Sequence, residues 1–285
     1  MPRELPTDDW TETIGRRYRR FVDRMQKGEL NAAAEEFARL CHWMQKSSLK
    51  FSNRMMAAFT EGWLEVFWQC RRWDLVLKVS EDAESYFGDD PEWRFARGEA
   101  LFYLGRFDEA REILEKLTHE DFDEPMVFYL LACLAERRHN EQEALRLFQT
   151  ANKLDSKSML VPVPVNEQEV ETLYRECLDE LPEKIAWHVK ELPIFVDAFP
   201  SDELIHSMDP PLDPLVLGVF LGEPMGNETT PWPSDQPRIL LFHKNIAKIA
   251  GDFDALEDEL RRTLFHEVGH YLGFDEDQLE EMGLA

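Results

Sequence analysis

The residues whose types and spacing could do chemistry lie near the C-terminal end, in TLFHEVGHYLGFDEDQ, residues 263–278. His266 and His270 are four residues apart, which is slightly more than one turn of a helix. On a helix they therefore share a face, and both imidazoles can bind one metal ion. Glu267 adjoins the first histidine, where it can hold a water molecule at the metal and accept its proton. The pattern predicts a zinc site with two histidine ligands and Glu267 as general base.

A third zinc ligand is expected just beyond the histidines, because a catalytic zinc site has three protein ligands and one open position. Gly273 can take the left-handed conformation that ends a helix and turns the chain back toward the metal. A spacing of ten residues from the first histidine then selects Glu276. Asp275 and Asp277 are the neighbouring alternatives, since each carries a carboxylate one residue away.

A helix and several strands must position these residues. An Asp-x-x-Glu start signal at Asp254 predicts a helix that begins near this residue and runs toward Gly273. Three apolar segments upstream predict short strands: LPIFVDAF, LVLGVFLG and RILLFHKNI. His243 lies in the last segment and is expected to be a partly buried strand histidine rather than a substrate contact. A helix over NEQEVETLYRECLDELPEKIAWHV precedes the strands.

The N-terminal half contains a repeat. Trp73 recurs as Phe107, and Ala110 recurs as Ala144, each pair 34 residues apart. A unit of about 34 residues that forms two helices is the tetratricopeptide period. Residues 92–118 show the pattern most fully and resemble tetratricopeptide repeats. Such an array either supports the structure or forms a concave groove that holds a peptide or a partner protein.

The helical pattern stops at DSKSMLVPVPVN, where Pro162 and Pro164 favour extended backbone. We therefore predict helical repeats over residues 10–157, a linker over residues 158–166 and a second domain over residues 167–285. The predicted fold class is multidomain, with an all-α repeat array followed by a small α/β domain.

Charge and hydropathy exclude several classes of protein. The net charge is −25, and residues 161–285 hold 8 Lys/Arg against 27 Asp/Glu, so this part should repel nucleic acid. The longest apolar run, residues 215–221, is too short to span a bilayer. The start MPRELPTDDW lacks the basic and apolar parts of a secretory signal, so we expect a cytoplasmic protein. The 4 cysteines are widely separated and are expected to be reduced core residues.

The segment from Glu167 to Ala285 resembles the small bacterial zincin-like metallopeptidases. The resemblance rests on LPIFVDAFPSDEL, LVLGVFLGEP, PRILLFHKNI and LFHEVGHYLGFDEDQLEEMG, in that order. It implies a compact α/β fold with a mixed sheet of few strands, a zinc helix and an acidic third ligand at Glu276. In related zincins an edge strand near the metal pairs with the extended substrate, and RILLFHKNI is the strand expected to do so. The repeats ahead of this segment are a departure from the family.

These observations predict a zinc metallopeptidase that hydrolyses peptide bonds. Water activated by the metal would be the nucleophile, Glu267 the base, and the repeats would recruit a peptide or protein substrate or a partner. The alternative is a non-enzymatic protein-interaction module with a structural or regulatory zinc site. Cleavage that depends on Glu267 separates the two.

Overall fold

The computed structural model describes residues 16, 17, 19–21, 23, 24, 27–46, 64, 67, 68, 70–120, 122–225 and 236–282 of the chain. They form two compact units, which lie within Met1–Asp123 and Glu124–Ala285. None of the helices in this described part combines the length and the apolar character that crossing a membrane requires.

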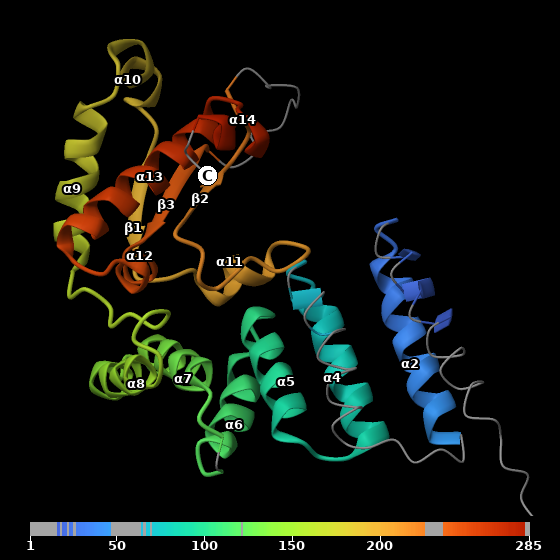
Figure 1. Cartoon of the computed structure of the whole chain (residues 1–285). Coiled ribbons are helices and arrows are strands. Elements are labelled where there is room, and N and C mark those ends of the chain that lie inside the picture. Colours follow the sequence, from blue (N-terminus) through green and yellow to red (C-terminus); the bar gives the residue numbers. More distant parts are fainter. Residues whose placement is uncertain are drawn as a thin grey trace, which may run out of the picture. The chain divides into compact units, whose positions relative to one another are not determined.

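Helices build the first unit (Figure 1): α2 (Leu30–Lys46), α4 (Trp73–Phe87), α5 (Pro91–Tyr103) and α6 (Phe107–Leu117). Helix α5 begins where the Asp90 side chain accepts a hydrogen bond from the Glu92 amide, with Pro91 in the first turn. Gly105 has a φ of 73°, which allows the tight turn into α6. Small residues such as Ala100 and Ala110 are fully buried and let the helices approach closely.

The repeat period is visible in the starts of the helices. Trp73, Phe107 and Glu141 are the first residues of α4, α6 and α8, at intervals of 34 residues. Pro91 and Pro125 open α5 and α7 at the same interval. The predicted helical repeat is therefore confirmed. The first predicted hairpin, over residues 10–45, lies partly outside the described residues.

The second unit joins a helix pair to an α/β fold. Its elements are α7 (Pro125–Arg137), α8 (Glu141–Leu154), α9 (Glu167–Asp179), α10 (Glu183–Val189), β1 (Ile194–Asp197), α11 (Asp202–His206), β2 (Gly218–Leu221), β3 (Arg238–Phe242), α12 (His243–Ile249), α13 (Phe253–Tyr271) and α14 (Glu276–Glu281). The Val163 amide donates to the Ala247 oxygen at 3.0 Å, and Val163 and Val165 pack on the core. The linker over residues 158–166 stays a prediction, although its valines are packed.

A mixed three-stranded sheet lies at the centre of the α/β fold, with the strand order β1-β3-β2. Strand β1 is parallel to β3, with Ile194 opposite Ile239, and β2 is antiparallel to β3, with Gly218 opposite Leu241. The mixed sheet of few strands is as expected. The expectation that RILLFHKNI forms the edge strand is wrong, because β3 is paired on both sides. The edge strand that pairs antiparallel with β3 is β2.

The strand predicted through His243 ends one residue earlier. Phe242 is the last residue of β3, and His243 is the first residue of α12. His243, Ile246, Ala247 and Ala250 are buried, at the spacing of one helical face. The expectation of a strand histidine is therefore wrong, although its burial is confirmed by an exposed fraction of 8%.

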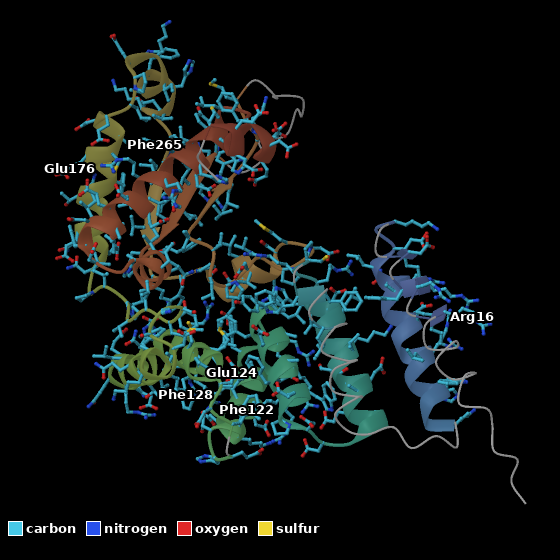
Figure 2. The ribbon with its side chains drawn as sticks, in the orientation of Figure 1. Arg16, Phe122, Glu124, Phe128, Glu176 and Phe265 are labelled. Atoms are coloured by element: carbon cyan, nitrogen blue, oxygen red, sulfur yellow. The ribbon has the colours of Figure 1, made fainter. Side chains whose placement is uncertain are left out.

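One face of the sheet carries the core. Val196, Ile239 and Leu241 point toward α13 and α9, where they meet Leu260 and Leu264. Figure 2 shows the side chains of these two helices, with Glu176 on α9 and Phe265 on α13. Successive strand residues alternate between faces, so Leu221 and Leu240 point to the other face of the sheet. The helix with the histidines is thus fixed by a continuous apolar layer.

Candidate metal centre

Helix α13 begins after a polar N-cap residue and ends before a glycine. Its N-cap is Asp252, whose side chain accepts from the Ala255 amide, so the start expected near Asp254 lies two residues after the cap. At the other end Gly273 has a φ of 91°. Its amide donates to the His270 oxygen at 3.0 Å, which reverses the chain. The predicted role of Gly273 in ending the helix is confirmed.

The reversed chain enters α14, which starts at Glu276. Asp275 is the N-cap: its side chain accepts from the Gln278 amide, and the Gln278 side chain accepts from the Asp275 amide, each at 2.9 Å. This capping box engages the Asp275 carboxylate. A Cβ atom at Gly269 would overlap Leu279, so only glycine lets α14 lie this close to α13.

The two histidines and Glu276 converge on one point. The Nε2 atoms of His266 and His270 are 2.9 Å apart. A carboxylate oxygen of Glu276 lies 3.3 Å from His270 Nε2, and the other lies 3.7 Å from His266 Nε2. Among the described residues, these three are the His, Cys, Asp or Glu residues that come together as a possible metal site. Asp277, the other alternative, is exposed and is not part of this cluster.

These distances fit a zinc ion. Two ligand atoms on one ion cannot be farther apart than twice the bond length, or about 4.4 Å for bonds of about 2.0–2.2 Å. The two histidine nitrogens, and each Glu276 oxygen with its nearer histidine, are closer than this limit, and one ligand atom from each residue lies within 4.8 Å of the others. Two imidazole nitrogens and one carboxylate oxygen form a donor set that catalytic zinc sites use. The residues present therefore fit the group that the family implies.

The surroundings orient the donors and leave them accessible. The Nδ1 atom of His270 lies 3.2 Å from the backbone oxygen of Phe274, a contact that directs its Nε2 atom toward the metal position. The side chains of His266 and His270 are 21% and 25% exposed, and that of Glu276 is 73% exposed. The cluster of ligand side chains is thus open to solvent.

Glu267 projects to the buried side of α13 and is 7% exposed. One of its carboxylate oxygens accepts a hydrogen bond from the Phe220 amide of β2 at 2.6 Å. Burial raises the pKa of the Glu267 carboxyl, while the two neighbouring histidines and the Phe220 amide act in the opposite direction. A raised pKa makes the carboxylate a stronger base toward a proton of water.

Two other candidate side chains serve the fold. Burial, with Lys244 and Lys248 nearby, lowers the pKa of His243 to about 4. The charged groups that act on His243 do not include the proposed ligands, so its environment is distinct from the metal centre. The Tyr271 hydroxyl donates to the backbone oxygen of His188 at 3.3 Å.

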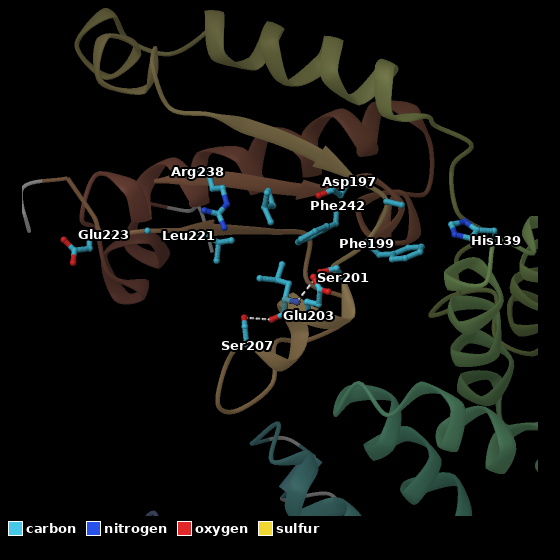
Figure 3. Close-up of a pocket in the computed structure, with 14 residues that line it drawn as sticks. His139, Asp197, Phe199, Ser201, Glu203, Ser207, Leu221, Glu223, Arg238 and Phe242 are labelled. Carbon is cyan, nitrogen blue, oxygen red and sulfur yellow. Dashed lines mark hydrogen bonds between the residues drawn. The ribbon is translucent and has the colours of Figure 1, made fainter. Parts of the chain in front are cut away.

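A groove of about 900 Å³ lies on the face of the sheet that α13 does not cover (Figure 3). Leu221, Leu240 and Phe242 form its apolar part, and Asp197 and Glu203 lie at its border. The residues that line it include none of the four proposed site residues. This groove is therefore separate from the chemistry of α13.

The helical repeats and the small α/β domain that follows them each match a known family. Residues 189–284 match the family described as zincin-like metallopeptidase, and residues 72–134 match the tetratricopeptide repeat. The predicted fusion is confirmed.

Solved structures that resemble the chain include two chains of MamA. One, described as "MamA MSR-1 C2", is 22% identical, covers 48% of this chain and 74% of that chain, and has a TM-score of 0.34. The other, a MamA mutant, is 22% identical, covers 49% and 95% of the two chains, and has a TM-score of 0.32. No curated protein matches the chain.

The sequence patterns did not reveal three further residues of the site. Phe220 contributes its backbone amide to Glu267, and no side-chain pattern marks such a group. Gly218 and Gly269 bring β2 and α14 close to α13. A glycine inside a strand or helix is the signal that could have identified them, because it often marks a close approach of two elements.

Proposed function

We propose that this protein is a zinc-dependent metallopeptidase in which His266, His270 and Glu276 hold the ion and Glu267 is the general base. The observation that carries the proposal is the convergence of one ligand atom each from His266, His270 and Glu276 within 4.8 Å of one another, beside a buried glutamate. Three ligands leave one coordination position for water or substrate, as in catalytic zinc sites.

A bound zinc ion would lower the pKa of water and polarise the carbonyl group of the peptide. Glu267 would take the proton of the attacking water as the oxygen adds to the carbonyl carbon. It would then pass this proton to the amide nitrogen, so that the C–N bond breaks to give a carboxylate and an amine. The Phe220 amide would hold one Glu267 oxygen and leave the other for this transfer.

The edge strand β2 is the element that we propose for binding the extended substrate. The Phe242 amide donates to the Leu217 oxygen, so the alternating residues Gly218 and Phe220 direct their backbone groups to the free edge. The Phe220 amide is engaged by Glu267, which leaves the Phe220 oxygen and the Gly218 backbone for a peptide. A peptide that pairs there would lie next to Glu267 and α13. Backbone pairing gives affinity with little selection of side chains.

The repeats are proposed to recruit the substrate protein or a partner. A hollow of about 290 Å³ in the first unit is lined by apolar residues that include Trp68 and Trp93, with Glu92 and Glu99 beside them. This combination suits an apolar side chain near a basic one. A helical array that holds a chain close to the metal would raise its effective concentration there.

The test compares the wild type with Glu267→Gln in mass-spectrometric profiling of cleaved peptides. We expect Glu267→Gln to keep its zinc and to lower kcat by about 10²–10⁴-fold, the usual contribution of a general base. Glu259→Gln is the matched control, since Glu259 lies on the same helix and pairs with Arg262 at 3.0 Å. Equal cleavage by the wild type and Glu267→Gln would refute the mechanism and favour the interaction module.

A further inference from the structure

Three polar side chains of the second unit are buried away from the proposed zinc ligands. Glu136 on α7 is 6% exposed, and Asn245 and Lys248 on α12 are 2% and 4% exposed. Charged side chains are seldom buried unless they are paired, because removing a charge from water costs free energy. Glu136 belongs to the last helix pair, and the other two residues belong to the α/β fold.

An ion pair and hydrogen bonds join these side chains in a row. Glu136 Oε2 lies 2.7 Å from Lys248 Nζ. Lys248 Nζ donates to Asn245 Oδ1 at 3.2 Å. Asn245 Nδ2 donates to the backbone oxygens of Pro214 and Val216, at 3.0 and 2.8 Å. The row therefore leads from α7 to the segment that enters β2.

The same segment continues to the proposed general base. The Phe242 amide donates to the Leu217 oxygen at 2.8 Å, and Gly218 follows as the first residue of β2. A Cβ atom at Gly218 would lie 3.2 Å from Glu267 Cγ. The Phe220 amide then donates to the Glu267 carboxylate at 2.6 Å. A displacement of β2 must therefore move the group that holds this carboxylate.

Helix α7 has a second attachment to the α/β fold. Arg137, next to Glu136, donates to the Pro200 oxygen and to Asp202 Oδ1, both at 2.7 Å. Its guanidinium group lies 4.6 Å from the centre of the Phe199 ring. These contacts fix α7 against the segment after β1, so Glu136 is a fixed end for the row.

We propose that Glu136, Lys248 and Asn245 are positioning residues that set the place of β2 and, through the Phe220 amide, the direction of the Glu267 carboxylate. The last helix pair, α7 and α8, is thus a support of the catalytic base as well as part of the repeat array. The catalytic meaning of this inference rests on the proposed function, but the structural coupling from α7 to β2 does not.

The experiment measures amide hydrogen exchange over residues 214–221 in the full chain, with zinc and after zinc removal. Glu136→Gln leaves the Lys248 ammonium buried without its counter-charge. We expect it to raise exchange in this segment by about tenfold, more than in α9 or α13. Glu141→Gln is the matched control, because Glu141 pairs with the neighbouring Lys244 and its side chain is 63% exposed. This variant should leave the segment unchanged.

A double variant separates positioning from stability. Glu136→Leu with Lys248→Met removes both charges and keeps apolar volume, so the urea midpoint should return toward the wild-type value. In this double variant Asn245 loses its hydrogen-bond donor Lys248, so exchange over residues 214–221 should stay raised. In cleavage assays kcat should stay low while KM changes little. Full recovery of both exchange and kcat would overturn the proposal, as would an equal rise for Glu141→Gln.

The hydrogen-exchange test of the positioning role does not depend on peptidase activity. If Glu267→Gln cleaves as well as the wild type, the proposed function fails, yet the exchange data still show whether α7 controls β2. If exchange rises uniformly over residues 124–282 in Glu136→Gln, the buried pair acts only on stability and the positioning role is refuted.

Discussion

Helix α6 of the repeats and helix α12 of the α/β fold use charge in different ways. On α6 the ion pairs lie at the surface, as in Arg106 with Glu109 and Lys116 with Glu112, where both side chains are at least 44% exposed. In the second unit Glu136 and Lys248 form a pair with side chains only 8% and 3% exposed. Exposed pairs stabilise a helix only slightly, because water screens the charges, whereas breaking a buried pair costs about 3–5 kcal/mol.

The two regions also differ in which contacts stabilise them and in which buried groups lower their stability. The repeats are stabilised by small and aromatic residues in contact, such as Trp73 stacked on Tyr103 at 4.0 Å. The α/β fold buries His243, Asn245, Lys248 and Glu267, each of which costs free energy unless it is paired. Polar burial of this kind is typical of regions that carry a function.

The largest expected effect comes from cutting the chain between the two kinds of region. A fragment of residues 124–285 keeps Glu136 beside Lys248, whereas a fragment of residues 164–285 lacks α7 and therefore the Glu136 ion pair and the Arg137 contacts to Pro200 and Asp202. We expect the shorter fragment to lose about 3 kcal/mol or more, since hydrogen bonds to charged groups contribute about 1.5–3 kcal/mol each and ordinary stability is about 5–15 kcal/mol. Circular dichroism and urea unfolding measure this. Equal midpoints for both fragments would contradict the prediction.

The second largest effect is expected at low pH, which should destabilise the α/β fold more than the repeats. The pKa of His243 is lowered to about 4 by burial, against about 6.5 in the unfolded chain. The unfolded state therefore binds a proton first as the pH falls, and stability is lost between pH ~6.5 and ~4, by about 3 kcal/mol at most. Unfolding by urea at several pH values measures the slope. His243→Gln should reduce it, whereas His119→Gln, an exposed residue of the repeats, should not. A slope unaffected by His243→Gln would contradict the assignment.

Two glycine substitutions of the same kind should differ in their effect on zinc. A Cβ atom at Gly98 would lie 2.9 Å from Leu114 Cδ2, and one at Gly269 would overlap Leu279 on α14. Each change to alanine should cost about 1–3 kcal/mol of stability through overpacking. Only Gly269→Ala should weaken zinc binding, because it moves the helix that carries Glu276. Competition with a chelator measures zinc affinity, and a loss in Gly98→Ala would show that the repeats act on the metal centre.

The smallest effects are expected at two helix caps. Asp90 accepts from the Glu92 amide at the start of α5, and Asp275 accepts from the Gln278 amide at the start of α14. Each change to alanine should cost about 1 kcal/mol of stability.

Zinc affinity should fall more in Glu276→Ala than in Asp275→Ala. The opposite order would make Asp275 the third ligand.

Local patterns predicted much of the fold. The 34-residue period identified the repeats, and the three apolar segments contain the three strands. These local patterns could not predict the order of the strands in the sheet. The sequences of β2 and β3 are similarly apolar, and the two strands differ only in which neighbours they pair with. His243 was misplaced for a related reason: a short apolar run with a polar residue fits either a strand or the first turn of a helix.

The sequence by itself determined which side chains can meet on α13, because the helical period puts His266 and His270 on one face whatever surrounds them. It also determined where that helix turns back, since Gly273 takes a conformation that other residues rarely adopt. Only the tertiary structure decided that the Phe220 amide holds Glu267 and that Lys248 is paired with Glu136 on α7. These contacts join residues that are far apart in the chain or depend on backbone groups, and no local period of the sequence records either.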